Sequence, residues 1–209
     1  MAKNYQLKLD KEIESLQGER PELLLHSCCG PCSSYVLEYL SQYYQVTLLW
    51  YNPNIWPPEE NDKRLYYQRK IIDSLGLHDE VKIVLPEYDH DRYLQMVSGL
   101  ESEPEGGERC TECFRLRLKE AAEAAKKLGI ELYCTTLTVS PHKNADKINA
   151  LGETIGAEYG VRFLPSDFKK RNGYKRSIEL SKEYDLYRQD YCGCEFAYRG
   201  DHSAEACLE

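Results

Sequence analysis

The stretch LLLHSCCGPCSS, from Leu23 to Ser34, begins as a buried β-strand and continues into a turn that contains three cysteines. A proline follows where it suits the first turn of a helix, so the stretch predicts a strand, a turn and a helix. In α/β nucleotide-binding proteins glycines occupy such a turn, because free N–H groups at the helix start bind an anion or a cofactor. Here thiols occupy the turn, which raises the question of what the sulfur atoms bind.

Short runs rich in Val, Ile and Leu alternate with longer amphipathic segments along the rest of the chain. This alternation is typical of βαβ units and predicts a doubly wound α/β fold, with a Rossmann-like, mainly parallel sheet flanked by helices. The expected strands are Glu22–His26, Gln45–Tyr51, Val81–Leu85, Glu131–Thr136 and Val161–Leu164. The expected helices are Pro31–Ser41, Pro58–Leu75, His90–Gly99, Cys110–Leu128 and Asn144–Tyr159. Ligands of such sheets bind beyond the carboxyl ends of the strands, where the three cysteines are expected to lie.

Length and composition indicate one domain. The chain has 209 residues, of which 42% are hydrophobic, enough for one sizeable core. We expect residues 1–209 to form a single α/β domain in which residues 1–20 are an N-terminal extension. Residues 165–209 are basic and tyrosine-rich without a clear strand, so we expect a mostly helical C-terminal extension that completes the site.

The charge balance argues against a protein that coats nucleic acid without sequence preference. The net charge is −8, whereas such binding requires a surplus of Lys and Arg, so any nucleic-acid contact must use a local basic patch. The sequence shows no secretion signal and no apolar run of the ~20 residues that a membrane span requires. We therefore expect a cytoplasmic protein with no membrane partner. In that compartment the nine cysteines are expected to be metal ligands or redox groups, with a disulfide only in an oxidised form.

Seven of the cysteines form three tight groups, each at a predicted turn or helix start. The groups are Cys28, Cys29 and Cys32; Cys110 and Cys113; and Cys192 and Cys194. Backbone amides at such positions hydrogen-bond to thiolate sulfur and lower the thiol pKa. Seven thiolates exceed the four ligands of one tetrahedral zinc ion or one cubane cluster, so the set predicts two metal centres.

Simpler explanations exist for each group taken alone. A lone CxxC is often a structural zinc site or a chance occurrence, and adjacent cysteines can be small buried residues. A thioredoxin-like redox pair at Cys110 and Cys113 is disfavoured, because a charged, glycine-containing loop precedes it instead of a strand. We expect Cys134 to be a core residue and Cys207 to be a bystander in the tail.

Three motifs together resemble the QueH-type epoxyqueuosine reductases. They are HSCCGPCSS, GGERCTECFRLRL and SDFKKRNGYKRSIELSKEYDLYRQDYCGCEFA, and the resemblance extends from Leu23 to about Tyr198. It implies an α/β fold related to the nucleotide alpha hydrolases and ATP pyrophosphatases, in which a glycine-rich phosphate loop follows the first strand. Cysteines replace that loop here.

The resemblance also implies cofactors and their ligands. The family is understood to contain a [4Fe-4S] cluster and an additional mononuclear metal ion, expected to be iron. The positions that match its metal-binding cysteines are Cys28, Cys29, Cys110, Cys113, Cys192 and Cys194. The third position of the first motif is an aspartate in some members and Cys32 here, which implies a softer ligand for the additional metal ion.

The implied reaction converts epoxyqueuosine to queuosine at the wobble position of a tRNA with a GUN-type anticodon. An epoxide becomes an alkene and the oxygen leaves as water, which takes up two electrons and two protons. The electrons would come from an unidentified donor of low potential. By proximity to the cysteines, Tyr191 and His26 are candidate proton sources, and a packing role is the alternative for both.

A basic run lies shortly before the last cysteine pair. Its members are Lys169, Lys170, Arg171, Lys175 and Arg176, with Tyr174 among them. Such a run can bind a phosphate backbone and offer a ring on which an unpaired base stacks. A solvated charged loop is the alternative explanation.

Two other functions remain open from the sequence. A cluster-dependent tRNA sulfur transferase would need a pyrophosphatase loop of the SGGxDS kind, which the sequence lacks. A zinc-stabilised RNA-binding module without catalysis would contain zinc and no iron, so the metal content of anaerobically purified protein distinguishes it.

Overall fold

Five strands form one sheet in the computed structural model, which describes residues 4–197. The strands are β1 (Glu22–Ser27), β2 (Gln45–Trp50), β3 (Lys82–Val84), β4 (Leu132–Thr135) and β5 (Arg162–Phe163). Their order across the sheet is β3-β2-β1-β4-β5, and every neighbouring pair is parallel. The expected α/β fold with a parallel sheet is confirmed.

Strand β1 lies at the centre of the sheet because it is apolar on both sides. Leu23 and Leu25 belong to one buried cluster, and Leu24 between them belongs to another. Successive side chains of a strand point to opposite faces, so helices must cover both faces of the sheet.

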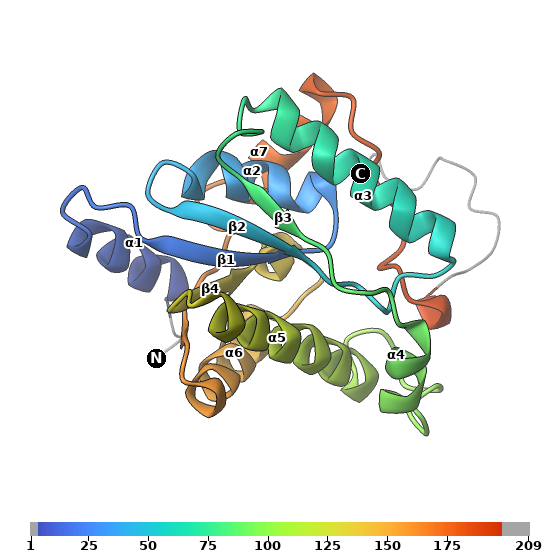
Figure 1. Cartoon of the computed structure of the whole chain (residues 1–209). Coiled ribbons are helices and arrows are strands. Elements are labelled where there is room, and N and C mark those ends of the chain that lie inside the picture. Colours follow the sequence, from blue (N-terminus) through green and yellow to red (C-terminus); the bar gives the residue numbers. More distant parts are fainter. Residues whose placement is uncertain (1–3, 198–209) are drawn as a thin grey trace.

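Seven α-helices and two short 3-10 helices accompany the strands in the described part of the chain. The α-helices are α1 (Tyr5–Ser15), α2 (Gly30–Leu40), α3 (Pro58–Ser74), α4 (His90–Met96), α5 (Glu108–Leu128), α6 (Ala145–Tyr159) and α7 (Gly173–Glu183). The 3-10 helices are η1 (Thr136–Val139) and η2 (Glu195–Ala197). Helices α2, α3 and α7 lie on one side of the sheet, and α5 and α6 lie on the other (Figure 1).

The strand order reverses beside β1. From β1 the chain proceeds to β2 and β3 on one side, and it later adds β4 and β5 on the other. Such a reversal leaves a crevice at the carboxyl ends of the two central strands, which is the usual ligand site of an open α/β sheet. The turn with the three cysteines follows β1 at this position.

The N-terminal residues form a helix that the sequence analysis described only as an extension. Helix α1 begins after Asn4, whose side chain accepts a hydrogen bond from the Leu7 N–H group. Tyr5 and Leu9 are buried, and Ile13 packs against the same cluster as Leu9. The four-residue spacing of these apolar side chains is the helical signal that the sequence contained.

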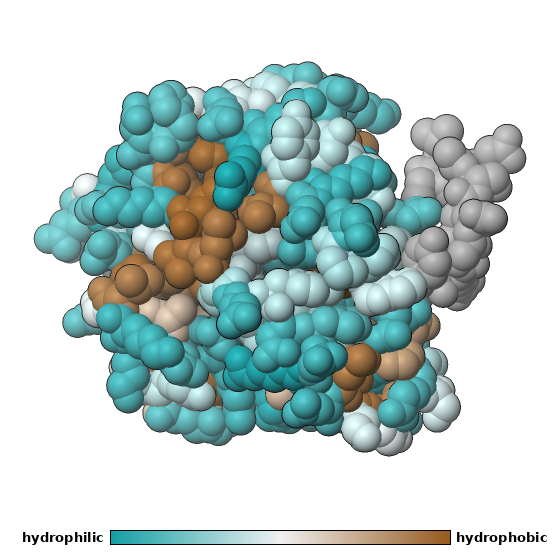
Figure 2. Space-filling model, turned by 45° about the vertical axis from the view of Figure 1, so that its right-hand side comes forward, coloured by the Kyte–Doolittle hydropathy of each residue, from teal (hydrophilic) through white to brown (hydrophobic). Residues whose placement is uncertain are grey.

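The surface is largely hydrophilic on the face shown in Figure 2, with apolar side chains gathered in one main patch. Among residues 4–197, no helix is both long enough and apolar enough to cross a membrane.

Candidate metal centre

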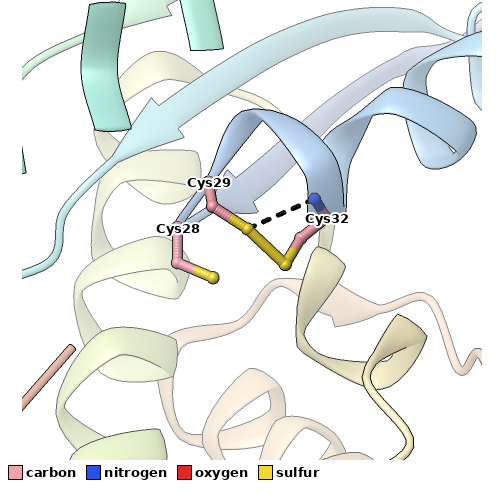
Figure 3. A group of neighbouring side chains, drawn as sticks. All are labelled: Cys28, Cys29 and Cys32. Carbon is pink, nitrogen blue, oxygen red and sulfur yellow. Dashed lines mark hydrogen bonds between the residues drawn. A yellow bond between two sulfur atoms is a disulfide. The ribbon is translucent and has the colours of Figure 1, made fainter. Parts of the chain in front are cut away.

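The first thiol group occupies the turn between β1 and α2. Cys29 is the N-cap residue of α2 and has an extended backbone, and its Sγ accepts a hydrogen bond from the Cys32 N–H group at 3.2 Å. The sulfur atoms of Cys28, Cys29 and Cys32 all lie within 4.8 Å of one another (Figure 3). Gly30 is required because a Cβ atom there would lie 2.6 Å from the Tyr67 carbonyl oxygen of α3. A helix start and a close helix contact therefore position these sulfurs.

Cys29 and Cys32 form a disulfide in this structure. The bond is possible because residues three apart at a helix start lie on the same side of the helix. The Gln189 side-chain amide donates to the Cys29 sulfur at 3.2 Å, which brings a residue near the C-terminus to this pair. From the sequence a disulfide is expected only in an oxidised form, and Cys29–Cys32 is the disulfide in this structure.

The second thiol group lies on the first turn of α5. This helix runs antiparallel to the strands, so its N-terminus lies at the same edge of the sheet as the turn after β1. The Cys110 sulfur accepts a hydrogen bond from the Gly106 N–H group at 3.2 Å. Burial raises the pKa of the Cys113 thiol to about 12; Arg117 opposes this shift, and the nearby thiols of Cys192 and other cysteines add to it. Cys113 is therefore a neutral thiol at pH 7 unless a cation binds it.

The third group lies on a C-terminal strap, residues 186–194, that α3 holds in place. The Arg64 guanidinium donates to the carbonyl oxygens of Tyr191 at 3.3 Å and Cys192 at 3.2 Å. The Trp56 N–H group donates to the Gly193 carbonyl oxygen at 2.7 Å. Gly193 has a φ of 116°, which side-chain residues rarely adopt. Hydrogen bonds from Arg64 and Trp56 thus fix the backbone around Cys192 and Cys194.

The three groups share one buried environment. Cys28, Cys29, Cys113 and Cys194 belong to the same cluster, and Cys32 and Cys110 pack against it. The hydroxyl group of Tyr93 on α4 hydrogen-bonds to the Cys194 sulfur. Cys134 belongs to the cluster on the opposite face of the sheet, where its thiol contacts the Leu164 carbonyl oxygen at 3.4 Å. Cys207 lies outside the described residues.

The two candidate proton sources have different surroundings. His26 is fully buried, with its ring nitrogens 2.9 Å from Thr135 Oγ1 and 3.2 Å from the Tyr51 carbonyl oxygen. Burial, and next the nearby Arg117 cation, lower the pKa of His26 to about 3, so the ring is neutral; it links β1 to β4 and to Tyr51 after β2. Tyr191 is partly exposed, and its hydroxyl group donates to the Trp56 carbonyl oxygen at 2.5 Å.

Acidic neighbours compensate most of the basic run. Lys169 pairs with Asp167 at 2.7 Å, Arg176 with Glu38 at 2.6 Å, and Arg171 with Asp10. Lys175 lies 4.0 Å from Glu179. Tyr174 lies half-buried on the first turn of α7. Within residues 4–197, Lys170 is the cation of the run that makes no ion pair. The excess of positive charge in the sequence run is therefore largely cancelled in the fold.

Residues other than cysteine complete the site, and sequence reasoning missed them. Arg117 is buried one helical turn after Cys113, Tyr93 and Gln189 contact sulfur, and Arg64 holds the strap. Only Arg117 has a sequence signal, because its i+4 spacing from Cys113 places both residues on one face of α5. The other contacts depend on the tertiary fold.

Fold and site together define a class: a parallel α/β protein with three clustered thiols in the turn after its first strand. Comparison with known proteins specifies the family. The model of the family Epoxyqueuosine reductase QueH matches residues 23–200. A protein of that name from Streptococcus pyogenes serotype M1 is 40% identical over 94% of this chain and 80% of its own length.

Two further proteins named Epoxyqueuosine reductase QueH are similar. That from Staphylococcus aureus strain Mu50 is 42% identical over 93% of this chain and 85% of its own length. That from Thermotoga maritima is 35% identical over 84% of this chain and 89% of its own length. The chain belongs to the epoxyqueuosine reductase QueH family.

Gly193→Ala should disturb the third thiol group for two reasons. The added Cβ atom would lie 2.9 Å from Arg64 Nη1, and alanine rarely adopts the φ of 116° that this position has. We expect the affinity for Co²⁺, measured from thiolate absorption bands, to fall about tenfold or more, as when a supporting residue of a metal site is lost. Tyr187→Phe, elsewhere on the strap, is the control, since it keeps the ring and removes only the hydroxyl group that donates to Glu60 of α3. Equal affinities of Gly193→Ala and the parent would show that the strap does not position ligands.

Metal binding by the first thiol group should require reduction, because a disulfide sulfur is not a thiolate ligand. Metal-free protein prepared in air should show two more titratable thiols after treatment with a dithiol, and should bind more Co²⁺. Cys32→Ser cannot form this disulfide and should bind equal amounts of Co²⁺ with and without the dithiol. A Co²⁺ content of the parent that is independent of reduction would contradict this prediction.

Proposed function

We propose that this chain reduces the epoxide of epoxyqueuosine at the tRNA wobble position to the alkene of queuosine, with metal centres held by its clustered thiols. The observation that supports this proposal is that cysteines of all three groups belong to or pack against one buried cluster, in a member of this family. The reaction consumes two electrons and two protons and releases water. An external donor of low potential would supply the electrons.

The residues fit a thiolate-bound iron centre. The donor set is sulfur only, is mostly buried, and exceeds the four ligands of one cluster. The buried Nη2 atom of Arg117 has no hydrogen-bond partner among the described residues, as expected of a cation next to anionic groups that form on metal binding. Hydrogen bonds from Gly106, Cys32 and Gln189 to sulfur are of the kind that set cluster potentials.

We assign seven residues to the metal centres. The proposed ligands of a [4Fe-4S] cluster and an additional iron ion are Cys28, Cys29, Cys32, Cys110, Cys113, Cys192 and Cys194. When bound, these groups supply electrons one at a time and a Lewis acid for the epoxide oxygen. The protein contributes burial, which excludes water, and the support of the sulfurs by α2, α5 and the strap.

Tyr191 is the better candidate for the proton donor. It is partly exposed beside Cys192, and the Arg64 guanidinium lies 5.1 Å from its ring centroid. His26 is sealed in the core and hydrogen-bonded at both nitrogens, so it has no path to a substrate without movement of the strands. We therefore propose that Tyr191 Oη releases its bond to the Trp56 carbonyl oxygen and protonates the leaving oxygen.

The test of this function is anaerobic reconstitution followed by nucleoside analysis. Protein reconstituted with iron and sulfide should contain more than about four iron atoms per chain, since one cubane accounts for four. With a chemical reductant it should convert epoxyqueuosine in tRNA to queuosine, as measured by mass spectrometry. Replacement of Cys28, Cys113 or Cys194 by alanine should abolish conversion.

Cys134→Ala is the matched control for these variants, because Cys134 is equally buried but lies on the opposite face of the sheet. It should keep both iron and activity. Two results would contradict the proposal. One is parent protein that contains zinc and no iron, which would indicate an RNA-binding module. The other is loss of the cluster in Cys134→Ala that is still folded.

The basic run should contribute to tRNA binding mainly through Lys170. We propose that Lys170 contacts a phosphate, with Tyr174 and the paired cations Lys169, Arg171, Lys175 and Arg176 around it. Lys170→Glu should weaken tRNA binding and reduce the slope of log affinity against log salt by about one unit. Iron content should not change.

Lys126→Glu, at the far end of α5, makes the same charge change on an exposed residue and should leave the slope unchanged. If both variants weaken binding equally, net charge alone explains the effect. If Lys170→Glu binds tRNA like the parent across the salt titration, the run is a solvated surface.

A further inference from the structure

Arg117 is a buried arginine without a carboxylate partner. Its relative exposure is 2%, and none of the ion pairs in the described part of the chain involves it. Its Nε donates to the Cys113 carbonyl oxygen at 3.3 Å, and its guanidinium lies 5.8 Å from the Phe114 ring centroid. These two contacts leave the buried Nη2 atom without a hydrogen-bond partner among residues 4–197.

The ionisable groups near this guanidinium come from several segments of the chain. They are Cys113 on α5, Cys28 after β1, Cys192 on the strap, Tyr93 on α4 and His26 on β1. The neutral His26 supplies no negative charge. Thiol sulfur is therefore the main source of a counter-charge.

A buried charge that lacks a partner is costly, so the arginine needs a compensating anion. In the metal-free protein no carboxylate of residues 4–197 pairs with Arg117, and its Nη2 atom has no hydrogen-bond partner among them. With metal bound, the cysteine sulfurs around it are thiolates. The cation is then unpaired in the metal-free protein and paired in the loaded protein.

We propose that Arg117 is the counter-cation of the metal centre: it stabilises the thiolates of three separate chain segments and favours the reduced, more negative state of the centre. Arg117 contacts the protein around the ligands and not the substrate, so it is a positioning residue. This inference rests on the proposed function only in that thiolates bind a metal.

A structural role for Arg117 predicts a different outcome. If Arg117 mainly supports α5 through the Cys113 carbonyl oxygen and the Phe114 ring, its loss should destabilise the metal-free and the loaded protein alike. If Arg117 is a counter-cation, its replacement by an apolar residue of similar length should have opposite effects on the metal-free and the loaded protein. The metal-free protein loses a buried charge that has no partner, whereas the loaded protein loses a charge that is paired with thiolates.

The experiment compares Arg117→Met, Arg117→Lys and the parent as full-length chains. Thermal unfolding of reduced, metal-free protein and Co²⁺ affinity are measured for each. Arg115→Met is the control, since it removes a positive charge from the same helix but from a half-exposed residue that pairs with Glu112.

We expect metal-free Arg117→Met to unfold at the same temperature as the parent or higher, and to bind Co²⁺ at least about tenfold more weakly, as for lost second-shell support. Arg117→Lys should bind within about threefold of the parent, because it keeps the charge, and Arg115→Met should bind like the parent. In iron-loaded Arg117→Met the ratio of reduced to oxidised centre at a fixed potential should fall about tenfold, or about 59 mV for one electron.

Two outcomes would overturn the inference. One is a lower unfolding temperature of metal-free Arg117→Met with Co²⁺ affinity unchanged, which would assign Arg117 to structure. The other is Arg117→Lys as weak as Arg117→Met, which would show that charge is not the determinant. The unfolding, Co²⁺-binding and redox measurements do not use epoxyqueuosine. A parent protein that binds metal but does not reduce the nucleoside would therefore refute the proposed function and leave this inference standing.

Discussion

The parallel sheet is the constraint on which the site depends. Because all neighbouring strands are parallel, their carboxyl ends lie at one edge, together with the N-termini of the helices that connect them. Cys28 and Cys29 follow β1 and Cys110 and Cys113 begin α5, so two groups about eighty residues apart reach the same crevice without a long loop. Only the third group needs a special device, which is the strap held along α3 by Arg64.

Because the thiol groups are buried, the stability of this site depends on whether a metal is bound. The same close packing that excludes water from the cysteines also raises the pKa of Cys113 and leaves the Arg117 cation without a partner. Metal binding would remove both costs together, because metal-bound thiolates need no proton and provide the arginine with negative charge. Folding energy and metal affinity are thus coupled, and the Cys29–Cys32 disulfide is a second way to satisfy reactive thiols when no metal is bound.

The sequence predicted the parts of this protein that rest on local pattern. Alternating apolar runs predicted all five strands to within one residue at each end, and the first cysteine motif was correctly expected in the turn after the first strand. The role of His26 depends on packing that no local pattern encodes, since its ring joins β1 to Thr135 of β4 and Tyr51 after β2. The same holds for Gln189, which reaches Cys29 only because the strap returns along α3.

Charge compensation shows most clearly why a count of basic residues is a poor guide to an RNA surface. In the sequence, Arg171 and Arg176 belong to one positive run, but in the fold Arg171, in the turn before α7, pairs with Asp10 of α1, and Arg176 on α7 pairs with Glu38 of α2. Glu179 and Glu183 also lie within 4.0 Å of Arg176, so three carboxylates surround one cation there.

A phosphate that approached Arg176 would therefore meet net negative charge, although partly exposed ion pairs are weak enough, at about 0–1 kcal/mol, for a phosphate to compete with one carboxylate. At Lys170 no carboxylate of the described chain has to be displaced. If Lys170 contacts the tRNA backbone as we propose, this acidic protein binds phosphate at a lysine that no carboxylate of the described chain pairs with, while Arg171 and Arg176 of the same run pair with α1 and α2.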